Sequence, residues 1–125
     1  MIQHILIVED NSDDQVLLSH VVRWITKHRS DVARDGLDAI LKAEGKDYDL
    51  VLVDVNLPDR TGWEVVETLR QARRYATIPI IAVTAFDDTG ARLRSAEVGC
   101  DAYLTKPVDI DKMAEVLNSL LGNFN

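Results

Sequence analysis

The sequence lacks long apolar runs and contains a single cysteine. One cysteine, Cys100, excludes an internal disulfide framework and a cysteine-rich zinc site, and it favours a reducing compartment. No apolar run approaches the roughly 20 residues that cross a bilayer, and the first residues, Met1-Ile2-Gln3-His4, are too short and uncharged to begin a signal peptide. We therefore expect a cytoplasmic protein without a membrane span or a membrane partner.

Basic residues are also scarce, with 14 Lys and Arg against 21 Asp and Glu and a formal net charge of −7. Direct binding to nucleic acid or to an anionic membrane needs basic surface, so this balance disfavours both classes of partner. A small cation or a basic partner fits better. At 125 residues the chain can bury one core, and we expect a single domain over residues 1–125.

Short apolar runs alternate with longer stretches in which apolar residues recur at helical spacing. This alternation predicts an α/β fold with a parallel sheet. The expected strands cover residues 4–8, 30–33, 49–53, 79–83 and 100–104. The second strand has little apolar material, which places it at a sheet edge.

Five helices are expected between and after these strands. They cover residues 12–27, 36–45, a stretch after Gly62, residues 88–98 and residues 109–121. The first can be capped by Ser12 or Asp13 and presents an apolar stripe that includes Val16 and Leu17, with Trp24 covering its end. The second packs through Leu37, Ile40 and Leu41.

Charged and polar side chains stand where four of these strands end. Glu9 and Asp10 follow the first strand, Asp54 the third, Thr84 the fourth and Lys106 the fifth. In an open parallel sheet, ligands bind beyond the carboxyl ends of the strands, so we expect these side chains to converge. Three nearby carboxylates require a compensating cation, and oxygen ligands without His or Cys favour Mg²⁺.

This set of residues suits phosphoryl transfer, which requires positioning and charge stabilisation. Lys106 can neutralise an incoming phosphoryl group, and the Thr84 hydroxyl can donate to one of its oxygens. A carboxylate is available as nucleophile, and Asp54 is the best candidate because it ends the most apolar, central strand.

Four motifs in this order resemble the receiver domain of two-component response regulators. They are Glu9-Asp10 after Ile-Leu-Ile-Val, Asp54-Val55-Asn56-Leu57-Pro58 with Gly62, Thr84-Ala85 after Ile-Ala-Val, and Tyr103-Leu104-Thr105-Lys106-Pro107. The resemblance covers roughly residues 3–122. It implies a flavodoxin-like (βα)5 doubly wound sheet with strand order 2-1-3-4-5, an order for which a receiver is already a known example.

The resemblance also implies a role for the acidic residues. Asp54 resembles the phosphoacceptor that takes a phosphoryl group from a histidine kinase or a histidine phosphotransfer protein. Glu9, Asp10, the Asp54 carboxylate and the backbone carbonyl of Asn56 resemble the ligands of Mg²⁺ in that family.

Further roles follow from the same resemblance. Lys106 would pair with a phosphoryl oxygen, and Pro107, cis in the family, would set the turn that directs it. Thr84 and Tyr103 resemble the switch pair of receivers, and the small Ala85 leaves space for the phosphodonor.

Phe86 and Asn56 occupy positions that tune the lifetime of the phosphoryl group in the family. The identity of these two residues does not predict the rate at which the phosphoryl group is lost. Each site residue taken alone also fits a plain structural role: Glu9-Asp10 a solvated loop, and Tyr103 a half-buried strand aromatic. Their joint placement carries the interpretation.

We expect a signalling module and not an enzyme with turnover. Phosphorylation would shift a two-state equilibrium on the face formed by helix 88–98, strand 100–104 and helix 109–121, which a target protein would read. No output domain is expected after Asn125, and the chain would be a monomer or a phosphorylation-linked dimer. Whether it stands alone or is cut from a larger regulator stays open, as do the kinase and the pathway.

Two other functions compete with this interpretation. A phosphatase or phosphotransferase with an aspartyl nucleophile usually has a second acid two residues after it, where this sequence has Asn56. An electron carrier of the flavodoxin type would need a phosphate-binding loop rich in Ser, Thr and Gly after the first strand, which is missing.

The remaining basic and histidine residues show no site pattern. His4, His20 and His28 have no metal-ligand spacing. Lys27-His28-Arg29 and Arg73-Arg74 fall at expected helix ends, where cations complement the helix dipole, so a solvated helix end is the simplest interpretation.

Overall fold

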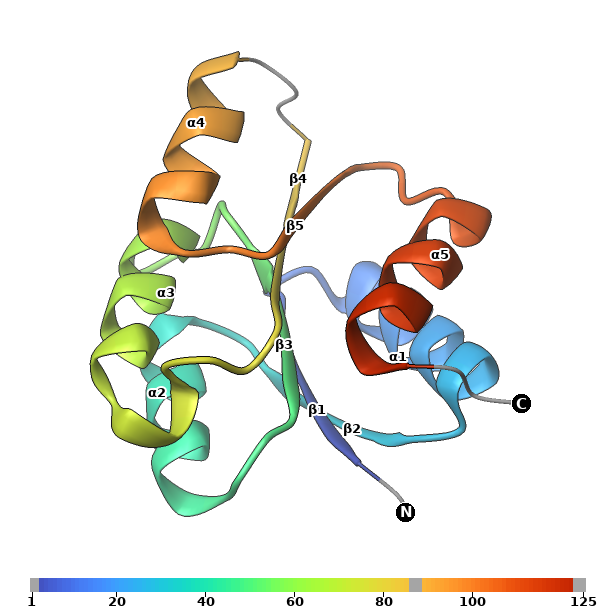
Figure 1. Cartoon of the computed structure of the whole chain (residues 1–125), viewed down its shortest axis with the longest axis horizontal. Helices are drawn as coiled ribbons and strands as arrows, with labels where there is room; N and C mark the ends of the chain where they lie inside the picture. Colours follow the sequence, from blue (N-terminus) through green and yellow to red (C-terminus); the bar gives the residue numbers. More distant parts are fainter. Residues whose placement is uncertain (1–2, 86–88, 123–125) are drawn as a thin grey trace.

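A computed structural model describes residues 3–85 and 89–122. Its sheet has five parallel strands in the order β2-β1-β3-β4-β5, drawn edge-on in Figure 1. The strands are β1 (His4–Val8), β2 (Arg29–Ala33), β3 (Leu50–Asp54), β4 (Ile80–Thr84) and β5 (Ala102–Thr105). The α/β fold class, the strand order and the edge position of the second strand are confirmed. Phe86 lies outside the described residues.

Helices cover both faces of the sheet. They are α1 (Ser12–Thr26), α2 (Gly36–Gly45), α3 (Gly62–Gln71), α4 (Thr89–Val98) and α5 (Ile110–Leu121). Figure 1 shows α1 and α5 on one face and α2, α3 and α4 on the other. Within the described residues, no helix is both long and apolar enough to cross a membrane.

Alternating residues of each strand pack into two separate cores, one on each face of the sheet, because successive side chains of a strand point to opposite faces. From β1, Leu6 and Val8 pack in the core beneath α2 and α3, whereas Ile5 and Ile7 pack beneath α1 and α5. A strand that is covered on both faces must be apolar throughout, which explains the continuous apolar runs in the sequence.

The expected helix faces are partly wrong. Val16, Leu17, Leu37 and Leu41 are each 45–57% exposed, and Trp24, which was expected to cover the end of the first helix, is 67% exposed. Apolar residues occur on more than one side of α1 and α2, so their spacing alone does not select the buried stripe. In α2 the buried stripe consists of the small residues Gly36, Ala39 and Ala43, and in α1 it consists of Leu18, Val21, Val22 and Thr26.

Two chain segments differ from the expected boundaries. The last strand begins at Ala102 and not at residue 100, because the turn from α4 extends through Gly99, whose φ of 99° favours glycine. A short 3₁₀ helix, η1 (Arg73–Tyr75), was not predicted. It places the buried Tyr75 hydroxyl against the carbonyl oxygens of Ala43 and Lys46 near the end of α2.

Candidate phosphoryl and metal site

Three side chains from distant parts of the sequence meet at the carboxyl edge of the sheet. Glu9 follows β1, Asp54 is the last residue of β3, and Lys106 follows β5. The Lys106 Nζ donates to Glu9 Oε1 at 2.6 Å and to Asp54 Oδ2 at 3.1 Å. A third carboxylate, that of Asp14 in the first turn of α1, accepts from the same nitrogen at 3.1 Å. The three N–H bonds of one ammonium group therefore have three carboxylate acceptors.

Asp14 was missed by the sequence analysis. It lies within a helix rather than at a strand end, and an acid in the first turn of a helix is ordinary because it complements the helix dipole. Only its contact with Lys106 distinguishes it. The nearest available signal was its place in the turn that follows Glu9 and Asp10.

Glu9 is completely buried. Its Oε2 accepts from the Asn11 N–H at 3.2 Å, and its backbone carbonyl accepts from the Gln15 side chain at 2.7 Å. Burial raises the pKa of Glu9 to about 7, the hydrogen bond from Lys106 opposes this rise, and the Asp54 carboxylate adds to it. A nearby cation therefore favours the charged form of the Glu9 carboxyl group, which burial disfavours.

The pKa of Lys106 is raised as well, although burial acts on an ammonium group in the opposite sense. Burial by itself lowers the pKa of an ammonium group, but hydrogen bonds to Glu9 and Asp14 and the charge of Asp54 hold the pKa of Lys106 above its usual range. Lys106 is therefore charged at physiological pH.

The acidic residues fit a hard divalent cation. Glu9, Asp10 and Asp54 each offer a carboxylate oxygen, and these oxygens lie within 4.8 Å of one another. The set combines two buried carboxylates with the exposed Asp10 and contains neither His nor Cys, which suits Mg²⁺. Beside it lies a hollow of about 390 Å³, lined by Asp10 and by residues of the loop after β3.

The loop after Asp54 is folded back on itself. The Asn56 N–H donates to Asp54 Oδ1 at 3.1 Å, Asn56 pairs with Thr61 in an antiparallel bridge, and the Gly62 N–H donates to the Val55 carbonyl at 2.7 Å. A Cβ at Gly62 would collide with the backbone oxygen of Asp54 and lie 2.8 Å from Val55 Cα. Glycine at this position therefore allows the start of α3 to lie against the end of β3.

The other residues singled out from the sequence lie around this edge. Thr84, the last residue of β4, is buried, and its carbonyl accepts from the Lys106 N–H at 2.7 Å. The Lys106–Pro107 peptide bond is cis. Ala85 is exposed.

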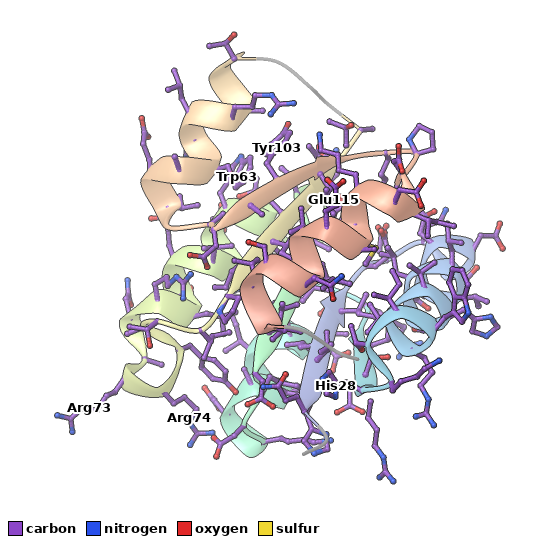
Figure 2. The ribbon with its side chains drawn as sticks, turned by 45° about the vertical axis from the view of Figure 1, so that its right-hand side comes forward. His28, Trp63, Arg73, Arg74, Tyr103 and Glu115 are labelled. Atoms are coloured by element: carbon purple, nitrogen blue, oxygen red, sulfur yellow. The ribbon has the colours of Figure 1, made fainter. Side chains whose placement is uncertain are left out.

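Tyr103 is half-buried in β5, and the Arg92 guanidinium carbon of α4 lies 4.8 Å from its ring centroid. Figure 2 shows Tyr103 close to α4 at the upper end of the view. The contact joins α4 to β5 through a cation–π interaction.

Comparisons with known proteins give a consistent result. The family model for the response regulator receiver domain matches residues 5–118. The polar-differentiation response regulator DivK of Brucella ovis is 34% identical over 123 residues, which cover 98% of this chain and 99% of DivK.

Solved structures agree with the sequence comparisons. The chemotaxis protein CheY4 of Vibrio cholerae aligns with a TM-score of 0.90 at 26% identity, over 96% of this chain and 99% of CheY4. The receiver domain of the sensor histidine kinase PA1611 of Pseudomonas aeruginosa aligns with a TM-score of 0.88 at 31% identity, over 98% of this chain and 100% of that domain. The PA1611 structure has a magnesium ion coordinated in its active-site cleft.

Proposed function

This chain belongs to the response regulator receiver domain family of two-component signalling, and from that premise we propose that Asp54 accepts a phosphoryl group in the presence of Mg²⁺. Response regulators interact with histidine kinases and with downstream targets. The proposed donor is therefore a phosphohistidine of a kinase or of a histidine phosphotransfer protein. The contact of Lys106 with Glu9 and Asp54, across 97 and 52 residues of sequence, is the observation that carries the proposal.

In the proposed reaction, a carboxylate oxygen of Asp54 attacks the phosphorus atom of the donor. The new bond joins that oxygen to phosphorus, the bond from phosphorus to the donor nitrogen breaks, and its electron pair stays on the imidazole. Asp54 is 5% exposed and its Oδ1 accepts a hydrogen bond from the Asn56 N–H, so the nucleophile has a fixed orientation. Lys106 is placed to contact a phosphoryl oxygen with an N–H that now points to Asp54.

The charge of the site explains why a cation is needed. Glu9, Asp14 and Asp54 surround the one ammonium group of Lys106. Asp10 adds a carboxylate near Glu9 and Asp54, and an incoming phosphoryl group adds further negative charge. Mg²⁺ held by Glu9, Asp10, Asp54 and the Asn56 backbone carbonyl would neutralise charge that develops on the phosphoryl oxygens.

The proposed output is a change on the face formed by α4, β5 and α5, which a target protein would read. Thr84 and Tyr103 would be the switch pair that connects the site to this face. In support, Arg92 of α4 stacks on Tyr103, and the apolar side chains of Leu93 in α4 and Ile110 in α5 are exposed. Monomer and phosphorylation-linked dimer are both compatible with this proposal, and the protein would act as a phosphoacceptor without turnover of a substrate.

The test is the intact mass of the protein after incubation with acetyl phosphate and Mg²⁺. The wild-type chain should gain one alkali-labile phosphoryl group, and Asp54→Asn should gain none while keeping the same circular dichroism spectrum. Asp101→Asn is the matched control at an acid far from the site, and it should be labelled like the wild type.

Two results would overturn the proposal. Stoichiometric labelling of Asp54→Asn would place the acceptor elsewhere. Steady hydrolysis of a phosphomonoester such as p-nitrophenyl phosphate, lost in Asp54→Asn, would identify an enzyme with turnover instead.

A further inference from the structure

The end of α1 that lies far from the acidic site carries an unusual group of exposed side chains. Arg23, Trp24 and Lys27 come from the end of this helix and Arg29 from the start of β2; together we call them the Trp24 surface. The helix begins next to Glu9 and has 15 residues, so its two ends are about 22 Å apart. In Figure 2, His28, which follows Lys27, is labelled in the lower part of the view, and Tyr103 in the upper part.

The Trp24 surface is hollowed on both sides of Arg23. One hollow, of about 520 Å³, is lined by Trp24, Lys27 and Val21 together with His20. The other, of about 530 Å³, is lined by His4, Arg23, His28, Arg29, Ser30 and the ion pair of Lys46 with Asp31. Trp24 is 67% exposed and lines the first hollow, and Arg23 lines both hollows.

The cations of the Trp24 surface have no acidic partner in residues 3–85 and 89–122. In that part of the chain, the neighbouring Lys46 forms an ion pair with Asp31 at 2.9 Å. Arg74 forms one with Asp47 at 2.9 Å. Arg23, Lys27 and Arg29 form no ion pair there. The helix dipole accounts for cations at the end of α1. It accounts neither for Arg29, which lies in a strand, nor for the exposure of Trp24.

We propose that the Trp24 surface binds an acidic segment of a partner protein, with carboxylates against Arg23, Lys27 and Arg29 and an apolar side chain against Trp24. Trp and Arg are the residues most enriched among those that dominate binding energy, and complementary charge sets specificity and association rate. These three cations form no ion pair within the described part of a protein of net charge −7, so they mark a local site for negative charge.

The overall charge separates this partner from other polyanions. A membrane or a nucleic acid presents an extended negative surface, which would repel the rest of this acidic chain. A short acidic segment touches only the hollowed surface and avoids that repulsion. The surface lies away from Asp54, so binding is independent of phosphorylation.

The probe is a short fluorescein-labelled peptide of alternating Glu and Leu, measured by fluorescence anisotropy with the full chain at low and high salt. Wild type should bind saturably, and Arg23→Glu and Trp24→Ala should each weaken binding about tenfold. Both positions are exposed, so these variants are expected to fold, which circular dichroism checks. Lys112→Glu, an exposed charge reversal on α5, should bind within about twofold of wild type.

The outcomes are distinguishable from those of the phosphorylation test. Asp54→Asn should bind the peptide like the wild type. The proposal is overturned if the wild type does not bind saturably, if Lys112→Glu loses as much affinity as Arg23→Glu, or if the protein binds phosphatidylglycerol vesicles and ignores the peptide.

Discussion

Asp59 Oδ1 accepts a hydrogen bond from the backbone N–H of Gly36 at 2.8 Å, across 23 residues of sequence. The second carboxylate oxygen accepts from the Leu37 N–H at 2.9 Å, so the loop after Asp54 holds the amino end of α2. These hydrogen bonds lower the pKa of Asp59 below its usual range. Because the loop also carries the Asn56 carbonyl, we regard Asp59 as a positioning residue for the proposed metal site.

Asp59→Ala should therefore loosen the loop and weaken the site. We expect a lower urea midpoint and about a tenfold loss in Mg²⁺ affinity, the size seen when residues that orient metal ligands are removed. Isothermal titration with Mg²⁺ and urea denaturation measure the two effects. Asp47→Ala, which removes an exposed carboxylate that pairs with Arg74, should leave Mg²⁺ affinity unchanged. A fall in the urea midpoint without a change in Mg²⁺ affinity would show that Asp59 stabilises the fold but does not position the metal site.

Gly62→Ala tests the close approach of α3 to β3. The added Cβ meets backbone atoms of Asp54 and Val55, which cannot move without shifting the end of β3, so we expect a loss of about 2 kcal/mol or more in the free energy of unfolding. Gly45→Ala is the matched control, since nothing lies within 4 Å of its added Cβ. It should gain up to about 1 kcal/mol because alanine loses less backbone entropy. Equal effects of the two substitutions in urea denaturation would contradict the predicted steric origin.

The buried carboxyl of Glu9 should make the metal-free protein less stable as the pH rises. Its pKa is about 7 in the folded chain and 4.5 in the unfolded chain, so the folded state binds the proton more tightly. Glu9 therefore adds stability that is fully present below pH 4.5 and is lost as the pH rises through about 7. The effect should reach about 2 kcal/mol between about pH 5 and pH 8.

Urea denaturation in the presence of EDTA measures this pH dependence, and Glu9→Gln should flatten it. Asp31 provides a control of opposite sign. Burial alone would raise its pKa, but hydrogen bonds from Tyr48 and Lys46 lower it, so its contribution is lost only as the pH falls through its folded pKa. Asp31→Asn should leave the slope between about pH 5 and pH 8 as it is. If the pH dependence of stability persists in Glu9→Gln, another titrating group is its cause.

Lys106→Met should leave two buried carboxylates without their cation. Removing one partner of a buried ion pair costs about 3 kcal/mol because a buried charge is left uncompensated. The loss in melting temperature should be largest near pH 8 and should shrink as Glu9 becomes protonated at lower pH. Added Mg²⁺ should restore part of the lost stability.

Lys106→Arg keeps the positive charge and is the matched variant. It should retain most of the stability of the wild type but lose phosphoryl uptake, because a planar guanidinium group does not reproduce the contacts of a compact ammonium group. A loss of stability in Lys106→Met that is the same at every pH would argue against an uncompensated carboxylate as its cause.

Local sequence patterns predicted the strands and the polar residues at their ends. Continuous apolar runs such as that of β1 occur where both faces of a strand are buried, and the polar residue that ends each run is visible without any structure. Parallel strands then require Glu9, Asp54 and Lys106 to lie at one edge. The order of the strands came from the family resemblance, since alternation alone does not specify it.

Long-range contacts were not visible in the same way. The sequence suggests no pairing of Asp14 with Lys106 or of Asp59 with Gly36, because an acid at a helix start or in a loop is ordinary by itself. The unpredicted η1 depends on a distant partner as well, since the Tyr75 hydroxyl meets carbonyls near the end of α2.

The amino-acid sequence by itself determined the α/β class, the approximate elements and the acidic edge, because hydrophobic periodicity and strand ends are local properties. Only the tertiary structure decided which apolar side chains are buried and which stay exposed, as Leu37 and Trp24 do. It also showed that the ammonium group of Lys106 contacts three carboxylates, and that Arg23, Lys27 and Arg29 form no ion pair within the described residues. Such outcomes depend on how helices pack and on which charges meet across the fold, and neither is encoded in the spacing of neighbouring residues.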